Sequence, residues 1–186
     1  MTFLTNRRIA VLISVVVAIV ATLVAVNRSM THLSRDIERM FYDGVPLERE
    51  GYTQPSIDSQ LKKHADATLG LATILVNYSE LHDDAENVLR LRRELLDAES
   101  IGEKSLAFLM MSRAVYSLSQ VASEVAMTEQ DKEALSQYSS TINGAEAFIR
   151  DSAYNQTNTA RWNERSAIAR IICFFVPVRE PEAFAT

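Results

Sequence analysis

An uncharged stretch of eighteen residues near the N-terminus, 9–26, constrains this chain more than any other feature. Its only polar residues are Ser14 and Thr22, whose hydroxyls can bond to the backbone of their own helix. As a helix rising about 1.5 Å per residue, the stretch spans about 27 Å, which is close to the hydrocarbon thickness of a bilayer. The sequence therefore predicts a transmembrane helix at residues 9–26, in contact with membrane lipid.

The length of the stretch and the residues after it distinguish a retained anchor from a cleaved signal peptide. A signal peptide has a shorter apolar region, of about 7–15 residues, and small residues at its cleavage site. The downstream end reads Leu-Val-Ala-Val-Asn-Arg, without a clean A-x-A motif. We expect residues 1–28 to be a retained anchor in the cell membrane, with cleavage as the alternative.

The charges around the stretch bear on its orientation. Arg7 and Arg8 precede it, and Arg28, Arg35 and Arg39 follow it, so the positive-inside rule is nearly balanced. The short, dense positive N-terminus and the acidic remainder favour an N-terminus inside the cell. We therefore expect a single-pass protein whose body is extracytoplasmic.

The body of the chain is acidic. All 24 acidic residues and 16 of the 19 basic residues follow Arg28, which leaves a net charge of −8 on the body. Nucleic-acid binding is driven by lysines and arginines that release counterions, so we expect no nucleic-acid partner. The single cysteine, Cys173, cannot form an internal disulfide and lies in an apolar run, where a thiol behaves as a small hydrophobe. That run, "IARIICFFVP", is either the end of the core or a surface that meets lipid or a partner.

Hydrophobic periodicity and few helix breakers predict helices after the anchor. The anchor helix can continue to about Tyr42, and residues 44–55, with two glycines and two prolines, are expected to form a loop. Residues 29–55 are thus a predicted juxtamembrane helix and loop. Further apolar stripes at helical spacing are found, in order, at residues 57–81, 88–98, 107–125 and 135–152.

Local signals place the ends of these helices. Pro55 suits the first turn of the first one. Ser100 and Glu103 have the spacing of a capping box, which predicts a break there, and residues 128–131 mark another helix start. The last helix is expected to run to about Phe174.

Helices with one apolar face each cannot be buried alone. The predicted fold class is therefore all-α, with the N-terminal transmembrane helix followed by an antiparallel up-down bundle of long helices. We expect the bundle at residues 56–176 and a C-terminal tail at residues 177–186.

Catalytic and metal-binding motifs are absent from the sequence. Di-iron bundles need Glu-x-x-His, but Ser, Leu and Ser stand three residues before His32, His64 and His82. Phosphate-binding glycine motifs, G-x-S-x-G and C-x-x-C are also absent. We therefore expect no enzymatic activity, no cofactor, and no catalytic, cofactor-binding or metal-binding residue.

Several residues have the right chemistry for a site but are expected to be structural. His82 lies beside three acidic residues at a helix turn, where caps and solvated side chains are common. His64 lies on an apolar stripe, as a packed histidine would. A basic cluster lies among acidic neighbours, as on a solvated helix face. The residues of these clusters are His82 with Asp83, Asp84 and Glu86, and Arg90, Arg92 and Arg93.

The segment "YNQTNTARWNERS", residues 154–166, is nearly devoid of aliphatic residues although a helix is expected there. Its Asn, Gln and Thr residues are mediocre helix formers, so something else must hold it. It is either a frayed exposed helix, a helix whose amides bond across the bundle, or a binding surface.

Several short motifs together resemble the LemA family. "IDSQLKKHAD", residues 57–66, resembles the I-D-x-Q-L-[KR]-[KR]-x-x-D signature that follows a single N-terminal membrane helix in that family. "INGAEAFI", the pairs Tyr154-Asn155 and Trp162-Asn163, and the ending "FFVPVREPEAF" resemble its later motifs. The resemblance covers residues 56–184 and the anchor.

The LemA resemblance implies a single-pass membrane protein with an antiparallel helical bundle. It implies no enzymatic activity or cofactor, and it favours residues 154–163 as a packed polar helix face. We expect a protein–protein interaction or scaffolding role at the cell envelope, with partners that the sequence does not identify. The alternative is an extracytoplasmic ligand-sensing four-helix-bundle module that works with a separate transducer.

Overall fold

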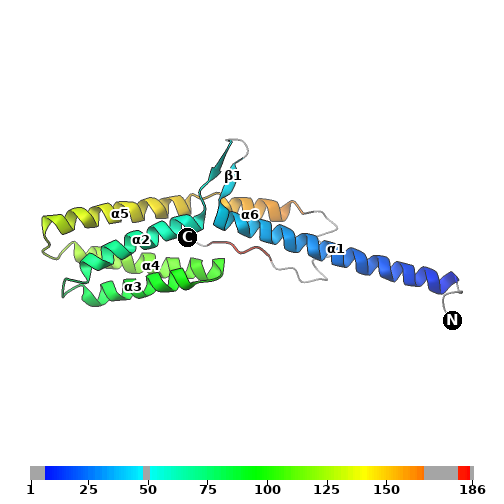
Figure 1. The fold of residues 1–186 in the computed structure, drawn as a ribbon, viewed down its shortest axis with the longest axis horizontal. Helices are drawn as coiled ribbons and strands as arrows, with labels where there is room; N and C mark the ends of the chain where they lie inside the picture. The colour runs from blue at the N-terminus through cyan, green and yellow to red at the C-terminus, as the bar shows by residue number, and fades with distance from the viewer. Residues whose placement is uncertain (1–6, 48–50, 166–179, 185–186) are drawn as a thin grey trace. The chain divides into compact units, whose positions relative to one another are not determined.

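The computed structural model describes residues 7–47, 51–165 and 180–184, and the chain is mostly helical in these ranges (Figure 1). The helices are α1 (Arg7–Asp43), α2 (Ile57–Leu75), α3 (His82–Asp97), α4 (Ile101–Ala122), α5 (Glu129–Arg150) and α6 (Tyr154–Asn163). Two short strands, β1 (Val45–Leu47) and β2 (Tyr52–Gln54), separate α1 from α2.

The described residues form two compact units. One unit combines α1 up to Glu38 with residues 158–165 and 180–181. The other, here called the body, runs from Arg39 to Thr157 and includes Glu182–Phe184.

The apolar part of α1 is uncovered. The large apolar side chains between Val11 and Val24 are 43–65% exposed, except Leu23, which is partly covered. The hydroxyls of Ser14 and Thr22 donate to the carbonyls of Ala10 and Ala18 at 2.9 and 2.8 Å, so each side chain is satisfied within its own helix. By length and composition α1 can cross a membrane, although an N-terminal signal sequence has the same properties.

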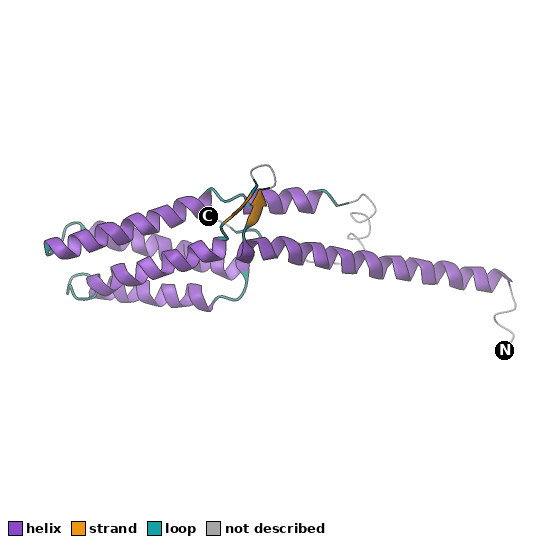
Figure 2. Ribbon diagram, turned by 45° about the horizontal axis from the view of Figure 1, so that its top comes forward, coloured by secondary structure: helices purple, strands orange, loops and turns teal. Residues whose placement is uncertain are grey.

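The expected loop at residues 44–55 contains a small hairpin instead (Figure 2). The strands β1 and β2 pair antiparallel, with Val45 opposite Gln54 and Leu47 opposite Tyr52. Gly44 permits the start of the hairpin because its φ is +99°, and a Cβ there would lie 2.3 Å from the carbonyl oxygen of Gln54. The glycines and prolines were thus correct signals of a helix break, and two strands of three residues each lie where a loop was expected.

The ends of α2 differ from their predicted positions. Ser56 is the N-cap and accepts a hydrogen bond from the Ser59 backbone, so Pro55 lies before the cap and not in the first turn. The helix ends at Leu75, six residues before the predicted Leu81. The Asn77 amide explains this stop, because it donates to the carbonyls of Thr73 and Ile74 in the last turn.

The predicted break before α4 is confirmed. The Ser100 hydroxyl accepts from the backbone of Glu103 at 3.1 Å, and the Glu103 carboxylate accepts from the backbone of Ser100 at 3.1 Å. This reciprocal capping box starts α4 directly after α3 ends.

Helices α2, α3, α4 and α5 lie side by side in the body (Figure 1). Close packing joins α2 to α5, α3 to α4 and α2 to α3. The hydrogen bonds from His64 to Glu146 and from Tyr78 to Asp131 show that α2 and α5 run antiparallel. Apolar stripes fill the space between these pairs; the fully buried positions include Leu71, Leu75, Ala85, Val88, Leu95, Met111, Leu118 and Ala145.

The predicted last helix is interrupted. Helix α5 ends at Arg150 and α6 begins at Tyr154. Side chains hold the intervening backbone. The backbone N–H of Ala153 donates to Gln54 Oε1 at 3.0 Å, and the backbone N–H of Tyr154 donates to Ser152 Oγ at 3.3 Å. The continuation that we expected to Phe174, with Cys173, lies outside the described residues.

The segment Glu182–Phe184 packs into the body. Phe184 is fully buried, with its ring 5.5 Å from that of Phe41 and 5.7 Å from that of Phe108. The Asn155 side chain holds the Phe184 backbone at both polar atoms, at 3.0 Å to the nitrogen and 2.6 Å to the oxygen. This end of the expected tail is therefore part of the core.

Candidate binding groove between α4 and α5

A groove lies between α4 and α5, which pack less closely than the other neighbouring helices of the body. It consists of two adjacent pockets of about 300 and 250 Å³ that share Ser119 and Ser139. Small side chains explain the gap, because Ser112 and Ser119 are seven residues apart on one stripe of α4 and face Ser139 on α5. Residues of this size cannot fill the space between two helix backbones.

The two pockets differ in character. The smaller one, here called the polar pocket, has a carboxylate, two amides and a phenol among its lining groups. Its residues beyond the shared serines are Ser112, Val115, Tyr116, Gln120, Ile142, Asn143 and Glu146. The larger one, the apolar pocket, is lined mainly by aliphatic side chains, and its residues are Leu71, Leu75, Ala122, Ser123, Val125, Met127, Lys132, Leu135 and Ser136.

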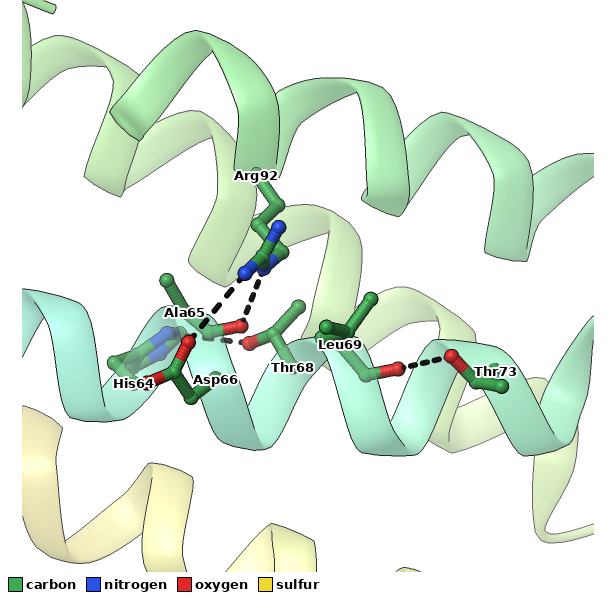
Figure 3. Close-up of polar contacts among 7 residues, drawn as sticks. All are labelled: His64, Ala65, Asp66, Thr68, Leu69, Thr73 and Arg92. Carbon is green, nitrogen blue, oxygen red and sulfur yellow. Dashed lines mark hydrogen bonds and ion pairs between the residues drawn. The ribbon is translucent and has the colours of Figure 1, made fainter. Parts of the chain in front are cut away.

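A buried histidine positions the carboxylate of the polar pocket. His64 is completely buried in α2, with Nε2 3.0 Å from Glu146 Oε1 and Nδ1 3.3 Å from Thr68 Oγ1. Figure 3 shows the His64–Thr68 contact along α2. Both contacts are satisfied when the Thr68 hydroxyl donates to Nδ1 and Nε2–H donates to Glu146. His64 also packs edge-on against Phe108, so the structure places it as a core residue, the role expected from the sequence.

Glu146 is held in its ionised form. The hydrogen bond from His64 lowers the pKa of Glu146, and this effect outweighs burial, which acts in the opposite direction. The neighbouring Ser112 hydroxyl lowers it further. The Glu146 side chain remains 35% exposed, so the charge is accessible from the groove.

The histidine and acidic residues at the start of α3 make local contacts that suit a helix start. His82 Nδ1 lies 2.8 Å from the Val76 carbonyl, and Asp83 and Asp84 occupy the first turn of α3, where the helix dipole favours acids. Across the described ranges, no group of three or more His, Cys, Asp or Glu side chains is placed to hold a metal ion.

The three clustered arginines have different contacts, and Arg93 is exposed, with Nε donating to the Leu89 carbonyl of its own helix at 3.4 Å. Arg90 bonds Glu94 and Asn87 on the exposed face of α3, as expected of a solvated helix. Arg92 instead joins two helices, because Nε donates to the Ala65 carbonyl at 2.8 Å and Nη2 lies 3.4 Å from Asp66 (Figure 3). Its guanidinium satisfies a backbone acceptor of α2 and fixes α3 against it.

The polar segment at residues 154–165 is packed. The Tyr154 hydroxyl donates to the Glu182 carbonyl at 2.8 Å, and the Asn155 amide donates to the Phe184 carbonyl. Trp162 Nε1 lies 3.3 Å from Glu180 Oε1, and Arg165 stacks over the Trp162 ring at 4.5 Å. Of the three expected alternatives, bonding of polar side chains across the fold describes these residues best.

Sequence reasoning missed the groove and the role of Glu146. The available signal was the serine stripe on α4, which is weak because small residues also suit close helix contacts. Glu146 gains its role from His64, 82 residues earlier in the chain, and no local pattern predicts that contact.

The sequence matches no family model, and no curated protein and no solved structure is significantly similar to it. The resemblance to the LemA family therefore rests on the short motifs quoted above.

Proposed function

We propose that this chain is a single-pass, membrane-anchored helical-bundle protein that acts by binding a protein partner at the cell envelope. In this proposal α1 stays in the membrane through residues 9–26, and the body is a LemA-like up-down bundle without enzymatic activity. The uncovered apolar surface of α1 supports the anchor. The sequence resemblance to the LemA family supports the bundle and the absence of a cofactor.

The observation that carries the interaction role is the open groove between α4 and α5. Its two pockets bring aliphatic side chains, amides and an ionised carboxylate to one face of the body. Tyr116 lines the polar pocket and is 69% exposed, so it adds an accessible aromatic side chain, a type enriched at interfaces, to this face. Such a mixture of apolar and polar groups is typical of partner-binding surfaces.

Site-specific photo-crosslinking tests this role in cells. A photoreactive residue replaces Gln120, which is exposed and lines the polar pocket, and the matched control replaces Ser117, which is exposed on the same helix outside the groove. We expect Gln120 to capture a defined protein that Ser117 does not. Equal capture from both positions, or none above background from Gln120, contradicts the proposal.

Protease accessibility with intact-mass measurement tests the anchor and the orientation. Full-length mass with cleavage of the body in intact cells agrees with an extracytoplasmic body. Cleavage only after lysis places the body in the cytoplasm and changes where partners are sought. A mass lower by about the first 26 residues contradicts the anchor.

The second candidate is a ligand-sensing module, which the groove favours because its two pockets, of about 300 and 250 Å³, together suit a small molecule. A thermal-shift screen of the full chain in detergent micelles tests this, since a ligand of the folded state raises the unfolding temperature. A screen without any stabilising compound removes the support for this candidate.

A further inference from the structure

We propose that the groove receives a basic side chain, Lys or Arg, from the protein partner, and that its charged end contacts Glu146. The inference rests on the proposed function and specifies the partner's chemistry. Among the described residues that line the polar pocket, Glu146 alone is charged, and His64 Nε2 holds its Oε1 at 3.0 Å. A carboxylate that cannot move away is a preorganised acceptor for a cation.

The other polar groups of this pocket also suit a donor. The buried Ser112 hydroxyl lies beside Glu146 and lowers the pKa of that carboxyl, and its oxygen can accept from a further donor. Gln120 and Asn143 add two amide oxygens that can accept. An ammonium or guanidinium group brings only donors, so it can satisfy several of these acceptors together, whereas a carboxylate ligand would face Glu146 directly.

The apolar contacts of the pocket fit the stem of such a side chain. Val115 and Ile142 line the wall between the polar groups, and the exposed Tyr116 ring stands at the edge. Lysine and arginine carry several methylenes below the charge, which pack on aliphatic walls while the charged end stays polar. A cation near the tyrosine face gains a further favourable contact.

Two features favour a protein segment over a free small cation. The apolar pocket continues the groove, and Leu135 lies eleven residues before Glu146, which is about 16 Å along α5. One peptide segment of about five extended residues can therefore place an aliphatic side chain at Leu135 and a basic one at Glu146. The chain after Arg28 also carries a net charge of −8, which attracts a basic segment before contact.

Two basic groups of α5 form ion pairs with acidic residues other than Glu146. Lys132, in the apolar pocket, lies 2.8 Å from Glu129. Arg150 lies one turn beyond Glu146 on α5, where its charge helps to lower the pKa of Glu146, and its ion pair is with Asp151 at 3.4 Å.

The test separates the charge of Glu146 from its structural role. Glu146→Gln removes the charge but keeps an oxygen that can accept from His64 Nε2–H. Glu133→Gln is the matched control, because Glu133 is an exposed residue of α5 outside the groove. The full chain in detergent micelles is titrated with n-butylguanidinium, which represents an arginine side chain, and with its neutral analogue n-butylurea. Methyl NMR signals of Val115 and Ile142 report binding.

We expect n-butylguanidinium to shift these methyl signals and n-butylurea to leave them unchanged. Glu146→Gln should weaken n-butylguanidinium binding about tenfold or more, because hydrogen bonds to charged groups are worth at least that factor, and Glu133→Gln should not. Equal binding of both probes, or binding that Glu146→Gln does not change, overturns the inference.

Crosslinking from Gln120 in the same two variants separates this inference from the proposed function. A partner captured in Glu133→Gln and lost in Glu146→Gln supports both. A partner captured equally in both variants upholds the proposed function and overturns the basic side chain. If no partner is captured while Glu146 still binds n-butylguanidinium, the ligand is a free organic cation, and both the protein partner and the proposed function are overturned.

Discussion

At the scale of single residues, Asp58 shows how partners decide the charge of a carboxylate. Its side chain is 10% exposed and lies 2.7 Å from Lys62 and 3.1 Å from Lys104. Burial alone would raise the pKa of Asp58, but the two lysines outweigh it and hold the pKa below its usual value. Lys104 is itself only 14% exposed, so this ion pair ties the start of α4 to the start of α2.

Removing the buried partner of Asp58 should destabilise the body. We expect Lys104→Met to lower the free energy of unfolding by about 2 kcal/mol, because it leaves a largely buried carboxylate with one exposed partner. The matched control is Lys132→Met, whose partner Glu129 is 90% exposed, so that its loss should destabilise the body clearly less than the loss of Lys104. Urea unfolding of the full chain in micelles measures both, and equal costs would contradict a stabilising role for Lys104.

Asp58 and Glu146 also predict an acid-sensitive fold. Both pKa values are lowered in the folded state, so the unfolded chain binds more protons as the pH falls, and stability decreases. The contribution is complete above the ordinary values of 3.8 and 4.5 and is lost as the pH falls through the lower folded values. Urea unfolding at a series of pH values should show a decline that begins near pH 5. Asp58→Asn should flatten this decline; an unchanged decline in that variant would exclude Asp58 as its source.

At the scale of elements, the contact between α2 and α5 depends on one glycine. A Cβ added at Gly70 would lie 2.3 Å from Cζ of Tyr138, so the tyrosine ring occupies the place of a side chain on α2. Glycine is otherwise a poor residue for a helix interior. Its cost in α2 is therefore offset by the packing of Tyr138 across the interface.

The two substitutions at this contact should be strongly coupled. Gly70→Ala alone should destabilise the body by about 1 kcal/mol, because the Tyr138 ring must move. In a Tyr138→Ala background the same substitution should stabilise it by about 0.5–1 kcal/mol, because alanine is the better helix former. A double-mutant cycle by urea unfolding measures the coupling, and purely additive effects would show that the ring does not pack on Gly70.

At the scale of the whole molecule, the body is closed by a segment from the far end of the chain. Phe184 enters an aromatic cluster with Phe41 and Phe108, and Asn155 holds its backbone. The Glu182 carboxylate also accepts from the Gly102 backbone at 2.8 Å, at the positive start of α4. The last described residues thus connect α1, α4 and α6 within the body.

Phe184 should therefore contribute to stability like any large core residue. Phe184→Ala should lower the free energy of unfolding by about 3 kcal/mol, because it empties a fully buried aromatic position. The neighbouring Ala183→Ser, at an exposed position, should change it by less than about 0.5 kcal/mol. Urea unfolding of both variants is the measurement, and a similar small effect from each would place Phe184 outside the stabilising core.

The sequence by itself determined the features that depend on near neighbours. The apolar length of residues 9–26, the helical spacing of α2 to α5 and the capping box of Ser100 and Glu103 all involve residues within about four positions or one unbroken run. Even so, the stop of α2 at Leu75 and the break before Tyr154 escaped prediction. In both, polar side chains bond free backbone groups, as Asn77 does locally and Gln54 does from 99 residues away.

Only the tertiary structure decided the features that depend on distances between helices. The groove exists because α4 and α5 stay apart while α2 packs on α3 and α5. Glu146 contacts His64, and Phe184 contacts Phe41, although the two residues of each pair lie far apart in the sequence. The physical reason is that periodicity reports which face of a helix is apolar but not which helix covers it. That choice follows from the volumes and hydrogen bonds of the packed chain as a whole.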